Sequence, residues 1–424
     1  MSISNYIYTL AGMALCSLLV GCQQDEIPTP QPAGDGTVIT FNSPYTVDTR
    51  SAAMRYGSFR QGDKVGVLGF CKAFNQGQDN SDAAWDVKKQ FCTPDVFYNE
   101  ELTYDGSGAW NYEWNGSFDG NDAVGTLHPW SRNEDDTFSF FAYYPYADVD
   151  NNDGKIIKDD WKDDKEYIRN GSGTIELSGR TERGDPKITY TMPFGTDGNT
   201  SSNRRWWHVP DFMLAYKVDH LKADGSVQLN FRHLLCAFEF EVNNYNDEDV
   251  IIEDFYFGGG TEYTSGPNEG ENATGFYRSF TVTGQQSGYD VDPADMYVGE
   301  FQLIGNDGTE DPHILTNFTC PAQTEGTSIA YEESPISILL IPDANGALTT
   351  DGNESVYIRI QAQTKDSHEQ IGDDSDYLMN LVNLNFEPGV RNIFTINIIG
   401  NDFYVQMRSD GYWEDDGDSE IVFE

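Results

Sequence analysis

The sequence lacks the motifs that mark most catalytic and metal sites. It contains no Gly-x-Ser-x-Gly elbow, no His-Glu-x-x-His pair, no phosphate-binding loop and no Cys-x-x-Cys or Cys/His cluster. Histidine is rare, with 6 residues, and His233 lies in an apolar strand pattern where a buried structural role is expected. Pairs of carboxylates are no evidence for a catalytic site, because 70 Asp and Glu residues could form such pairs anywhere in the chain. We therefore expect no enzyme, no metal site and no cofactor.

Basic residues are also scarce. There are 26 Lys and Arg against 70 Asp and Glu, which gives a formal net charge of −44. Such a surface repels phosphate backbones and anionic headgroups, so nucleic acid is excluded as an expected partner. The acids could bind divalent cations or could simply keep an exported surface soluble. The second interpretation is favoured because the acids are dispersed through turns.

Long helical patterns are nearly absent after the first residues. Aromatic residues and glycine are abundant instead, with 24 Tyr, 25 Phe, 8 Trp and 41 Gly. Strand-like runs recur between clusters of Gly, Asn and Asp, which is typical of an all-β chain. A length of 424 residues is too great for one ordinary sandwich and predicts two domains.

The stretch Val227–Val242 carries the longest strand pattern. Apolar residues alternate with a period of two up to Phe231, the pattern breaks between Arg232 and Leu235, and it then resumes shifted by one residue. Because a shift of one residue exchanges the buried and exposed faces, we expect a bulge or corner at Arg232–His233. One segment would then supply the core of a sheet on both sides of a bend, with one β-rich unit before it and another after it.

The start of the chain has the pattern of an export signal. Met1–Gly21 contains no charged side chain and includes the apolar run Leu10–Val20, which is too short to span a bilayer permanently. The run ends at Leu19-Val20-Gly21-Cys22, which resembles the lipobox of bacterial lipoproteins, although the usual basic residues before the run are missing. By this resemblance residues 1–21 are a signal peptide, Cys22 is lipidated, and the acidic, then proline-rich residues 22–36 form a flexible tether outside the outer membrane.

Four cysteines remain after Cys22: Cys71, Cys92, Cys236 and Cys320. An exported protein allows disulfides, and four cysteines admit three pairings that the sequence does not distinguish. Cys71 and Cys236 lie in apolar strand patterns, so buried free thiols are the favoured interpretation.

Several motifs follow one another in the order of a known family. They are Val38–Phe41, Gly62–Val67, Asn99–Thr103, Trp110–Tyr112, Phe138–Tyr146, Pro210–Tyr216 and Leu229–Val242. In this order they resemble the motifs of the fimbrillin-like surface proteins of Bacteroidales, the group that includes type V pilins. Pro388-Gly389 matches a later motif in part, with Asn392 where the family typically has Tyr.

The resemblance implies an all-β fold of two β-sandwich (transthyretin-like) domains in tandem after the lipoprotein leader. We expect the domains at residues 37–217 and 218–424. The implied function is that of a cell-surface fimbrial (pilus) subunit, anchor or tip protein that contributes to adhesion. Its partners would be other pilus subunits, as a homo- or heteropolymer, and the outer membrane through the lipid on Cys22.

The resemblance also implies a mode of assembly. In type V pilins an Arg-specific protease removes the N-terminal segment with the first strand, and a C-terminal strand of a neighbour fills the vacated groove. Here the removed strand would be Val38–Phe41 and the cleavage site Arg50 or, less favoured, Arg55. The donor region would contain Phe403, Val405, Met407, Ile421 and Phe423. The alternative is that Arg50 is an ordinary turn residue and the strand stays in place.

A different function class stays open, that of a surface glycan-binding lipoprotein without polymerisation. Exposed Trp and Tyr side chains form stacking platforms for sugars, although single aromatic residues more often fill sandwich cores. Trp206 and Trp207 cannot both face inward in one extended strand. This pair is therefore the predicted ligand platform, for host or bacterial surface glycans or proteins.

Overall fold

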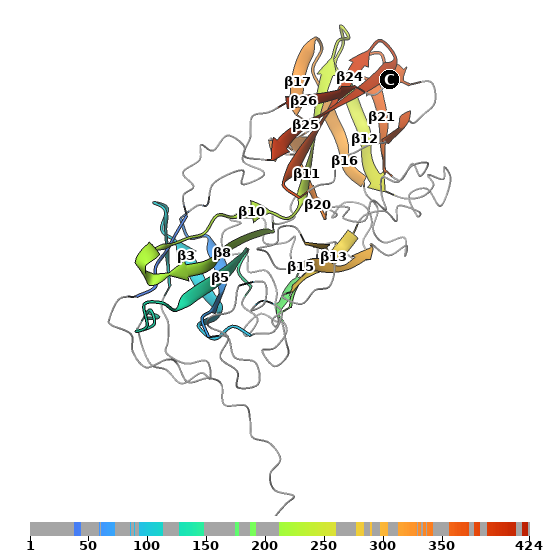
Figure 1. Ribbon diagram of the computed structural model, residues 1–424. Coiled ribbons are helices and arrows are strands. Elements are labelled where there is room, and N and C mark those ends of the chain that lie inside the picture. Colours follow the sequence, from blue (N-terminus) through green and yellow to red (C-terminus); the bar gives the residue numbers. More distant parts are fainter. Residues whose placement is uncertain are drawn as a thin grey trace, which may run out of the picture. The chain divides into compact units, whose positions relative to one another are not determined.

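The all-β prediction is confirmed by a computed structural model of the chain (Figure 1). The structure describes residues 38–43, 59, 61–72, 85, 89, 93–112, 127–147, 174–177, 187–191, 212–259, 277–283, 289–290, 297–303, 313–328, 330–331, 334–335, 337–341, 356–372, 377–381, 388–412 and 418–422. Strands make up most of these residues, and one 3-10 turn spans Lys222–Asp224. Within the described ranges no helix has the length and apolar character needed to cross a membrane.

The chain divides into two compact units, one of residues 1–38 and 113–132 and the other of residues 39–112 and 133–424. In the first unit Val38 forms an antiparallel bridge with Pro129, and Trp130 is buried. All the named strands belong to the second unit. The predicted division between residues 217 and 218 stays a prediction.

An eight-stranded sheet contains the first strands of the chain, in the order β10-β8-β5-β2-β3-β4-β1-β9. Its strands are β1 (Phe41–Asn42), β2 (Lys64–Phe70), β3 (Phe97–Tyr104), β4 (Ala109–Asn111), β5 (Thr137–Tyr144), β8 (Met213–Leu221), β9 (Val227–Gln228) and β10 (Arg232–His233). The rings of Phe41 in β1 and Phe140 in β5 lie 5.3 Å apart, although three strands separate β1 from β5 in the sheet. In a flat sheet the same strands would be about 19 Å apart. The sheet therefore folds over an aromatic core.

Two glycines of β2 make room for this core. A Cβ atom on Gly66 would collide with the ring of Tyr143, and one on Gly69 would lie 2.7 Å from the ring of Phe97. In both places the added Cβ atom would lie closer to the ring than Cβ atoms come to their neighbours in real structures. The glycines of the segment Lys64–Phe70 thus allow aromatic rings from β5 and β3 to lie directly against the backbone of β2.

Two further sheets pack face to face. The first sheet has the order β17-β11-β24-β25-β26, and β20 also pairs with β11. The second sheet has the order β16-β12-β21-β22, and β23 also pairs with β21. The rings of Phe240 in β11 and Phe255 in β12 lie 4.8 Å apart in an edge-to-face contact, which joins the inner faces of a sandwich. The strands are β11 (Cys236–Asn244), β12 (Val250–Gly259), β16 (His313–Cys320), β17 (Thr324–Ser328), β20 (Ser337–Leu340), β21 (Val356–Thr364), β22 (Gln370–Ile371), β23 (Tyr377–Leu381), β24 (Val390–Ile399), β25 (Asp402–Tyr412) and β26 (Asp418–Val422).

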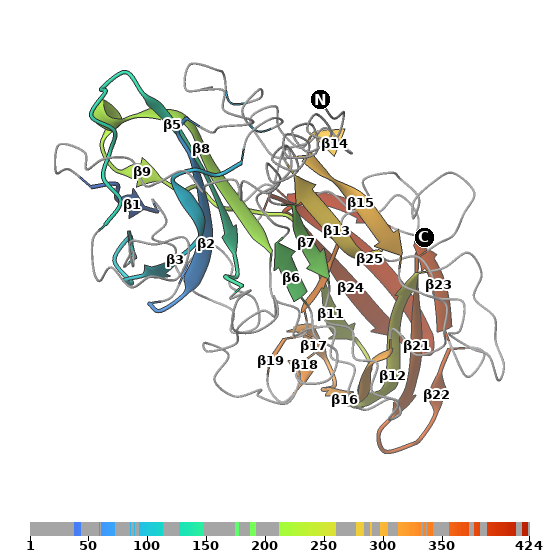
Figure 2. The ribbon, with the colours of Figure 1, turned by 90° about the horizontal axis from the view of Figure 1, so that it is seen from below.

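Another sheet combines strands that are far apart in the sequence, in the order β14-β15-β13-β7-β6 (Figure 2). Phe280 of β13 and Tyr190 of β7 pair across it, with ring centroids 5.5 Å apart. The sequence interpretation of one unit before Val227–Val242 and another after it did not include this pairing. The strands are β6 (Thr174–Leu177), β7 (Ile188–Thr191), β13 (Tyr277–Thr283), β14 (Tyr289–Asp290) and β15 (Tyr297–Leu303), and a separate pair is β18 (Ala330–Tyr331) with β19 (Ser334–Pro335).

The predicted break in Val227–Val242 is present, but the corner lies two residues later than predicted, because Arg232–His233 form strand β10. Strands β9 and β10 belong to the eight-stranded sheet, whereas β11 begins at Cys236 and belongs to the sandwich sheet. The chain bends at Leu234 and Leu235, directly after the predicted Arg232–His233, and both leucines are buried. One segment therefore supplies core residues to two sheets, as the shift in its apolar pattern indicated.

Candidate functional site

The first strand, β1, lies between two other strands of the eight-stranded sheet (Figure 2). It is antiparallel to β4 and parallel to β9. On the β9 side the amides of Val227 and Leu229 donate to the carbonyls of Thr40 and Asn42, each at 2.8 Å. On the β4 side the amide of Ser43 donates to the carbonyl of Gly108 at 2.8 Å. The backbone around β1 is thus hydrogen-bonded along both sides.

The side chains of this segment fill the aromatic core. Ile39 is fully buried and Phe41 is 1% exposed. The ring of Phe41 makes edge-to-face contacts with Phe97 at 5.5 Å, Tyr112 at 6.0 Å and Phe140 at 5.3 Å between ring centroids. The buried Tyr112 hydroxyl donates to the carbonyl of Ile39 at 2.8 Å. Taking this segment out would therefore leave both an apolar groove and unpaired backbone groups.

The last described strand, β26, lies at the edge of its sheet (Figure 1). It is antiparallel to β25, in a register that places Val422 opposite Gln406 and Asp418 opposite Asp410. Within the described part of the chain β25 is its only strand partner. One backbone edge of β26 is consequently without a strand, which is the geometry that pairs readily with another chain.

The predicted donor residues divide between two strands. Phe403, Val405 and Met407 lie in β25, and all three are buried in the core of this chain. Ile421 lies in the edge strand β26, opposite Met407, and Phe423 lies outside the described residues. The predicted donor region thus has two parts: β25, which belongs to the core of this chain, and β26, which lies at the sheet edge.

The other predicted site residues lie outside the described residues. These are Cys22, Arg50, Arg55, Trp206 and Trp207. Two other tryptophans in the aromatic-rich segments, Trp110 and Trp130, are buried at 2% and 4% exposure. They belong to the core, as expected for single aromatic residues.

Three of the four cysteines after Cys22 are described. Cys71, Cys236 and Cys320 are buried free thiols, which confirms the favoured interpretation for these three. The Cys236 thiol donates to the carbonyl of Leu340 at 3.3 Å, on the neighbouring strand β20. Cys92 lies outside the described residues.

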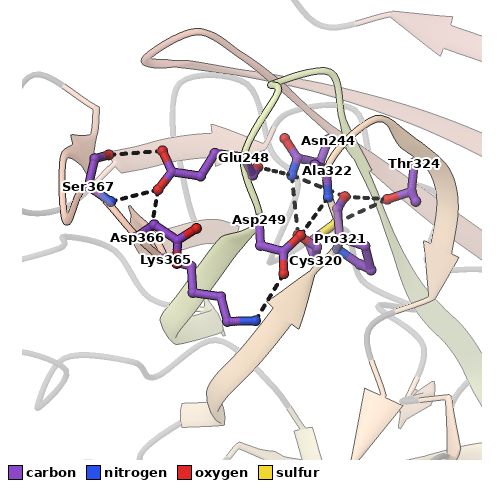
Figure 3. Close-up of polar contacts among 10 residues, drawn as sticks. All are labelled: Asn244, Glu248, Asp249, Cys320, Pro321, Ala322, Thr324, Lys365, Asp366 and Ser367. Atoms are coloured by element: carbon purple, nitrogen blue, oxygen red, sulfur yellow. Dashed lines mark hydrogen bonds and ion pairs between the residues drawn. The ribbon is translucent and has the colours of Figure 1, made fainter.

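A cluster of hydrogen-bonded loops at one end of the sandwich was missed by sequence reasoning (Figure 3). Asn244, at the end of β11, donates from its side-chain amide to the carbonyls of Glu248, Cys320 and Pro321, at 2.9, 3.2 and 3.1 Å. One side chain thereby joins the loop after β11 to the loop after β16. The only sequence signal for this cluster is the polar run Asn243–Asp249, and such a run does not differ from that of an ordinary solvated turn.

Two carboxylates extend this loop cluster. The Glu248 carboxylate accepts hydrogen bonds from the amides of Asp366 and Ser367, each at 2.6 Å, and these bonds lower its pKa (Figure 3). The Asp249 carboxylate accepts from the Ala322 amide at 3.0 Å and pairs with the Lys365 ammonium at 3.0 Å, which lowers its pKa. The cluster fixes three loops relative to one another. Among the described residues no group of three His, Cys, Asp or Glu side chains is arranged to hold a metal ion.

Comparisons with known proteins agree with this architecture. No family model matches the chain. A curated relative, "Fimbrium subunit Fim1C" of Phocaeicola vulgatus, is 22% identical over 430 residues, which span 97% of this chain and 98% of the relative. A crystal structure of a fimbrial protein from Bacteroides vulgatus is 18% identical and has a TM-score of 0.50, covering 88% of this chain and 99% of that one, so it shows a shared fold. The similarity to a fimbrium subunit along nearly the whole chain and the fold shared with a fimbrial protein agree with the resemblance seen in the sequence motifs.

Proposed function

We propose that this chain is a cell-surface fimbrial subunit, anchor or tip protein that assembles by strand exchange and contributes to adhesion. Its similarity to a fimbrium subunit over nearly the full length of both chains supports this role. The role is structural rather than catalytic. The observation that carries the mechanism is the position of β1 between β4 and β9, with Phe41 in the aromatic core.

The physical basis is strand complementation. Loss of β1 would expose the groove around Phe97, Tyr112 and Phe140 and would leave the Val227 and Leu229 amides without their acceptors. A strand from a neighbouring subunit would restore both the hydrogen bonds and the buried apolar surface. Burial of one large apolar side chain contributes about 1.5–3 kcal/mol, so two or three such residues make exchange favourable.

The donor is assigned to β26. Phe403, Val405 and Met407 stabilise the core of their own subunit, so removal of β25 would cost buried surface. Strand β26 has β25 as its one strand partner in the described chain, so inter-strand hydrogen bonds hold it along one side only. Ile421 and, beyond the described residues, Phe423 are the apolar residues at alternate positions of the donor.

Cleavage and anchoring complete the proposal. Arg50 and Arg55 lie in the sequence between β1 and β2, so hydrolysis at either one separates β1 from the rest of the chain. Cys22 would carry the lipid and hold the uncleaved chain at the outer membrane. A chain that keeps β1 would then act as an anchor, and a chain that loses it would accept a donor strand.

The test uses full-length protein in its native outer membrane. The double variant Arg50→Ala, Arg55→Ala should remain monomeric and lipidated, whereas the matched control Arg60→Ala should still be cleaved and should polymerise. Deletion of Glu420–Glu424 should block growth of the polymer and leave the thermal unfolding of the subunit nearly unchanged. Native protein that always retains Cys22 and never gives detergent-stable ladders on gels would contradict the strand-exchange proposal.

A further inference from the structure

A hollow of about 530 Å³ lies on the sheet β17-β11-β24-β25. Its polar lining comes from neighbouring strands. Glu241 of β11 pairs with Thr395 of β24, and Thr395 pairs with Gln406 of β25, which places the three side chains in one row across the sheet. The alternate residues Phe240 and Phe394 are buried in the sandwich core, so this row lies on the outer face.

An irregularity in β17 forms one side of the hollow. The register between β17 and β11 shifts between Val242 and Asn244, and Gly326 adopts a φ of +67°. The Gly326 amide donates to the side-chain oxygen of Asn243 at 2.6 Å, and the Asn243 amide donates to Asn397 at 2.7 Å. These bonds hold Asn243 in place on the face of the sheet.

The lining offers hydrogen-bond donors and acceptors close together. Glu241 and Glu325 supply carboxylates, and Arg408 supplies a guanidinium 3.6 Å from Glu241. Asn243 and Gln406 add amides, which donate and accept. A sugar hydroxyl also donates and accepts, so adjacent hydroxyls of a pyranose match a lining of this kind.

Aromatic surface adjoins the polar lining. Tyr404 lies two residues before Gln406 on β25, therefore on the same face, and is 51% exposed. Tyr245, which directly follows β11, is 41% exposed, and Ile399 of the intervening strand is 51% exposed. Within the described residues these three are among four large apolar side chains that are exposed. The two tyrosine rings among them are of the kind that stacks on the C–H faces of sugars.

We propose that this hollow binds a neutral saccharide. Its volume lies within the range of about 300–1,000 Å³ that is typical of small-ligand sites. The lining has two carboxylates against one guanidinium, and the whole chain carries a net charge of −44, so anionic sugars are repelled. The site is separate from β1, but Gln406 and Arg408 of its lining pair with β26, so departure of β26 as a donor strand would alter one side of the hollow.

The proposal is tested by saturation-transfer NMR on the full chain. The probes are lactose, maltose, mannose and N-acetylglucosamine, with N-acetylneuraminic acid as the anionic comparison. At least one neutral probe should bind at millimolar concentration, and N-acetylneuraminic acid should not. Gln406→Glu and Arg408→Ala should each weaken binding at least tenfold, and Tyr404→Ala should weaken it several-fold.

The matched control is Gln363→Ala on β21, in the opposite sheet of the same sandwich, which should leave binding unchanged. All variants change half-buried or exposed side chains, and an unchanged melting temperature verifies that each one folds. Absence of binding for every neutral probe would overturn the proposal. So would binding that persists in Gln406→Glu and Arg408→Ala, or a preference for N-acetylneuraminic acid. None of these results bears on polymer ladders, which test the fimbrial role separately.

Discussion

Phe41 has the largest structural role of any single residue in β1. Its ring contacts three other aromatic rings from β3, from β5 and from the end of the β4 segment. These rings come from distant parts of the sequence, so Phe41 stabilises the folded-over sheet and not merely its own strand. The same burial would make its groove attractive to an apolar residue of a donor strand.

Phe41→Ala in the full chain should lower the free energy of unfolding by about 3–5 kcal/mol, because it leaves a cavity between the three rings. Phe41→Leu fills most of that space and should lose about half as much or less. Urea denaturation monitored by tryptophan fluorescence measures both. A loss below about 1 kcal/mol for Phe41→Ala would contradict the packing role assigned to the Phe41 ring.

Glu100 makes stability depend on pH. Burial, together with the adjacent Glu101 carboxylate, raises the pKa of Glu100 to about 7 from an ordinary 4.5. The folded chain therefore keeps a proton that the unfolded chain releases, and this contribution to stability is lost as the pH rises from about 4.5 through 7.

Glu100→Gln should accordingly gain about 1–3 kcal/mol of unfolding free energy at pH 8 relative to the parent chain, and nearly nothing at pH 4. The comparison is Glu101→Gln, which removes the lesser cause of the raised pKa of Glu100 and also the ion pair with Lys64 at 3.1 Å, so its gain should be smaller. Denaturant titrations at the two pH values measure the difference. A gain that is equal at both pH values would contradict the assignment to Glu100.

At the scale of elements, strand positions were predictable wherever apolar residues alternate. The segment of β11 shows this alternation, whereas β2 and β5 are continuous apolar runs that are buried at nearly every position. Pairing between distant strands was not predictable, because periodicity describes one strand and carries no information about its neighbour. This explains why the sheet that joins β7 to β13 was missed and why the place of β1 between β4 and β9 was not predicted.

The loop cluster should stiffen its end of the sandwich in a pH-dependent manner. Hydrogen bonds from Ser367 and Asp366 lower the pKa of Glu248, so its contribution is present above the ordinary glutamate pKa and is lost as the pH falls through the lowered value. Glu248→Gln should lower the melting temperature at pH 7, and the difference should shrink in acid. Glu253→Gln, which affects an exposed side chain on β12, is the control and should change little.

For the whole molecule, the sequence motifs predicted the all-β fold and the family resemblance, because both depend on local patterns. The candidate assembly site was only half predictable. The predicted strand Val38–Phe41 overlaps the observed first strand, Phe41–Asn42, at Phe41. The division of the donor region into buried β25 and edge strand β26 depends on long-range pairing. The outer-face hollow had no sequence signal, since its residues come from four different strands.

The net charge of −44 predicts how assembly responds to salt. Subunits that exchange strands must approach closely, and like charges oppose that approach over a Debye length of about 30 Å at 0.01 M salt but only about 8 Å at 0.15 M. Polymer growth from purified, cleaved subunits should therefore be at least about tenfold faster at 0.15 M than at 0.01 M NaCl. Light scattering during growth measures the rate, and sucrose of equal osmolarity is the control for effects other than screening. Growth that slows as salt is added would mean that opposite charges at the contact between subunits outweigh the overall repulsion.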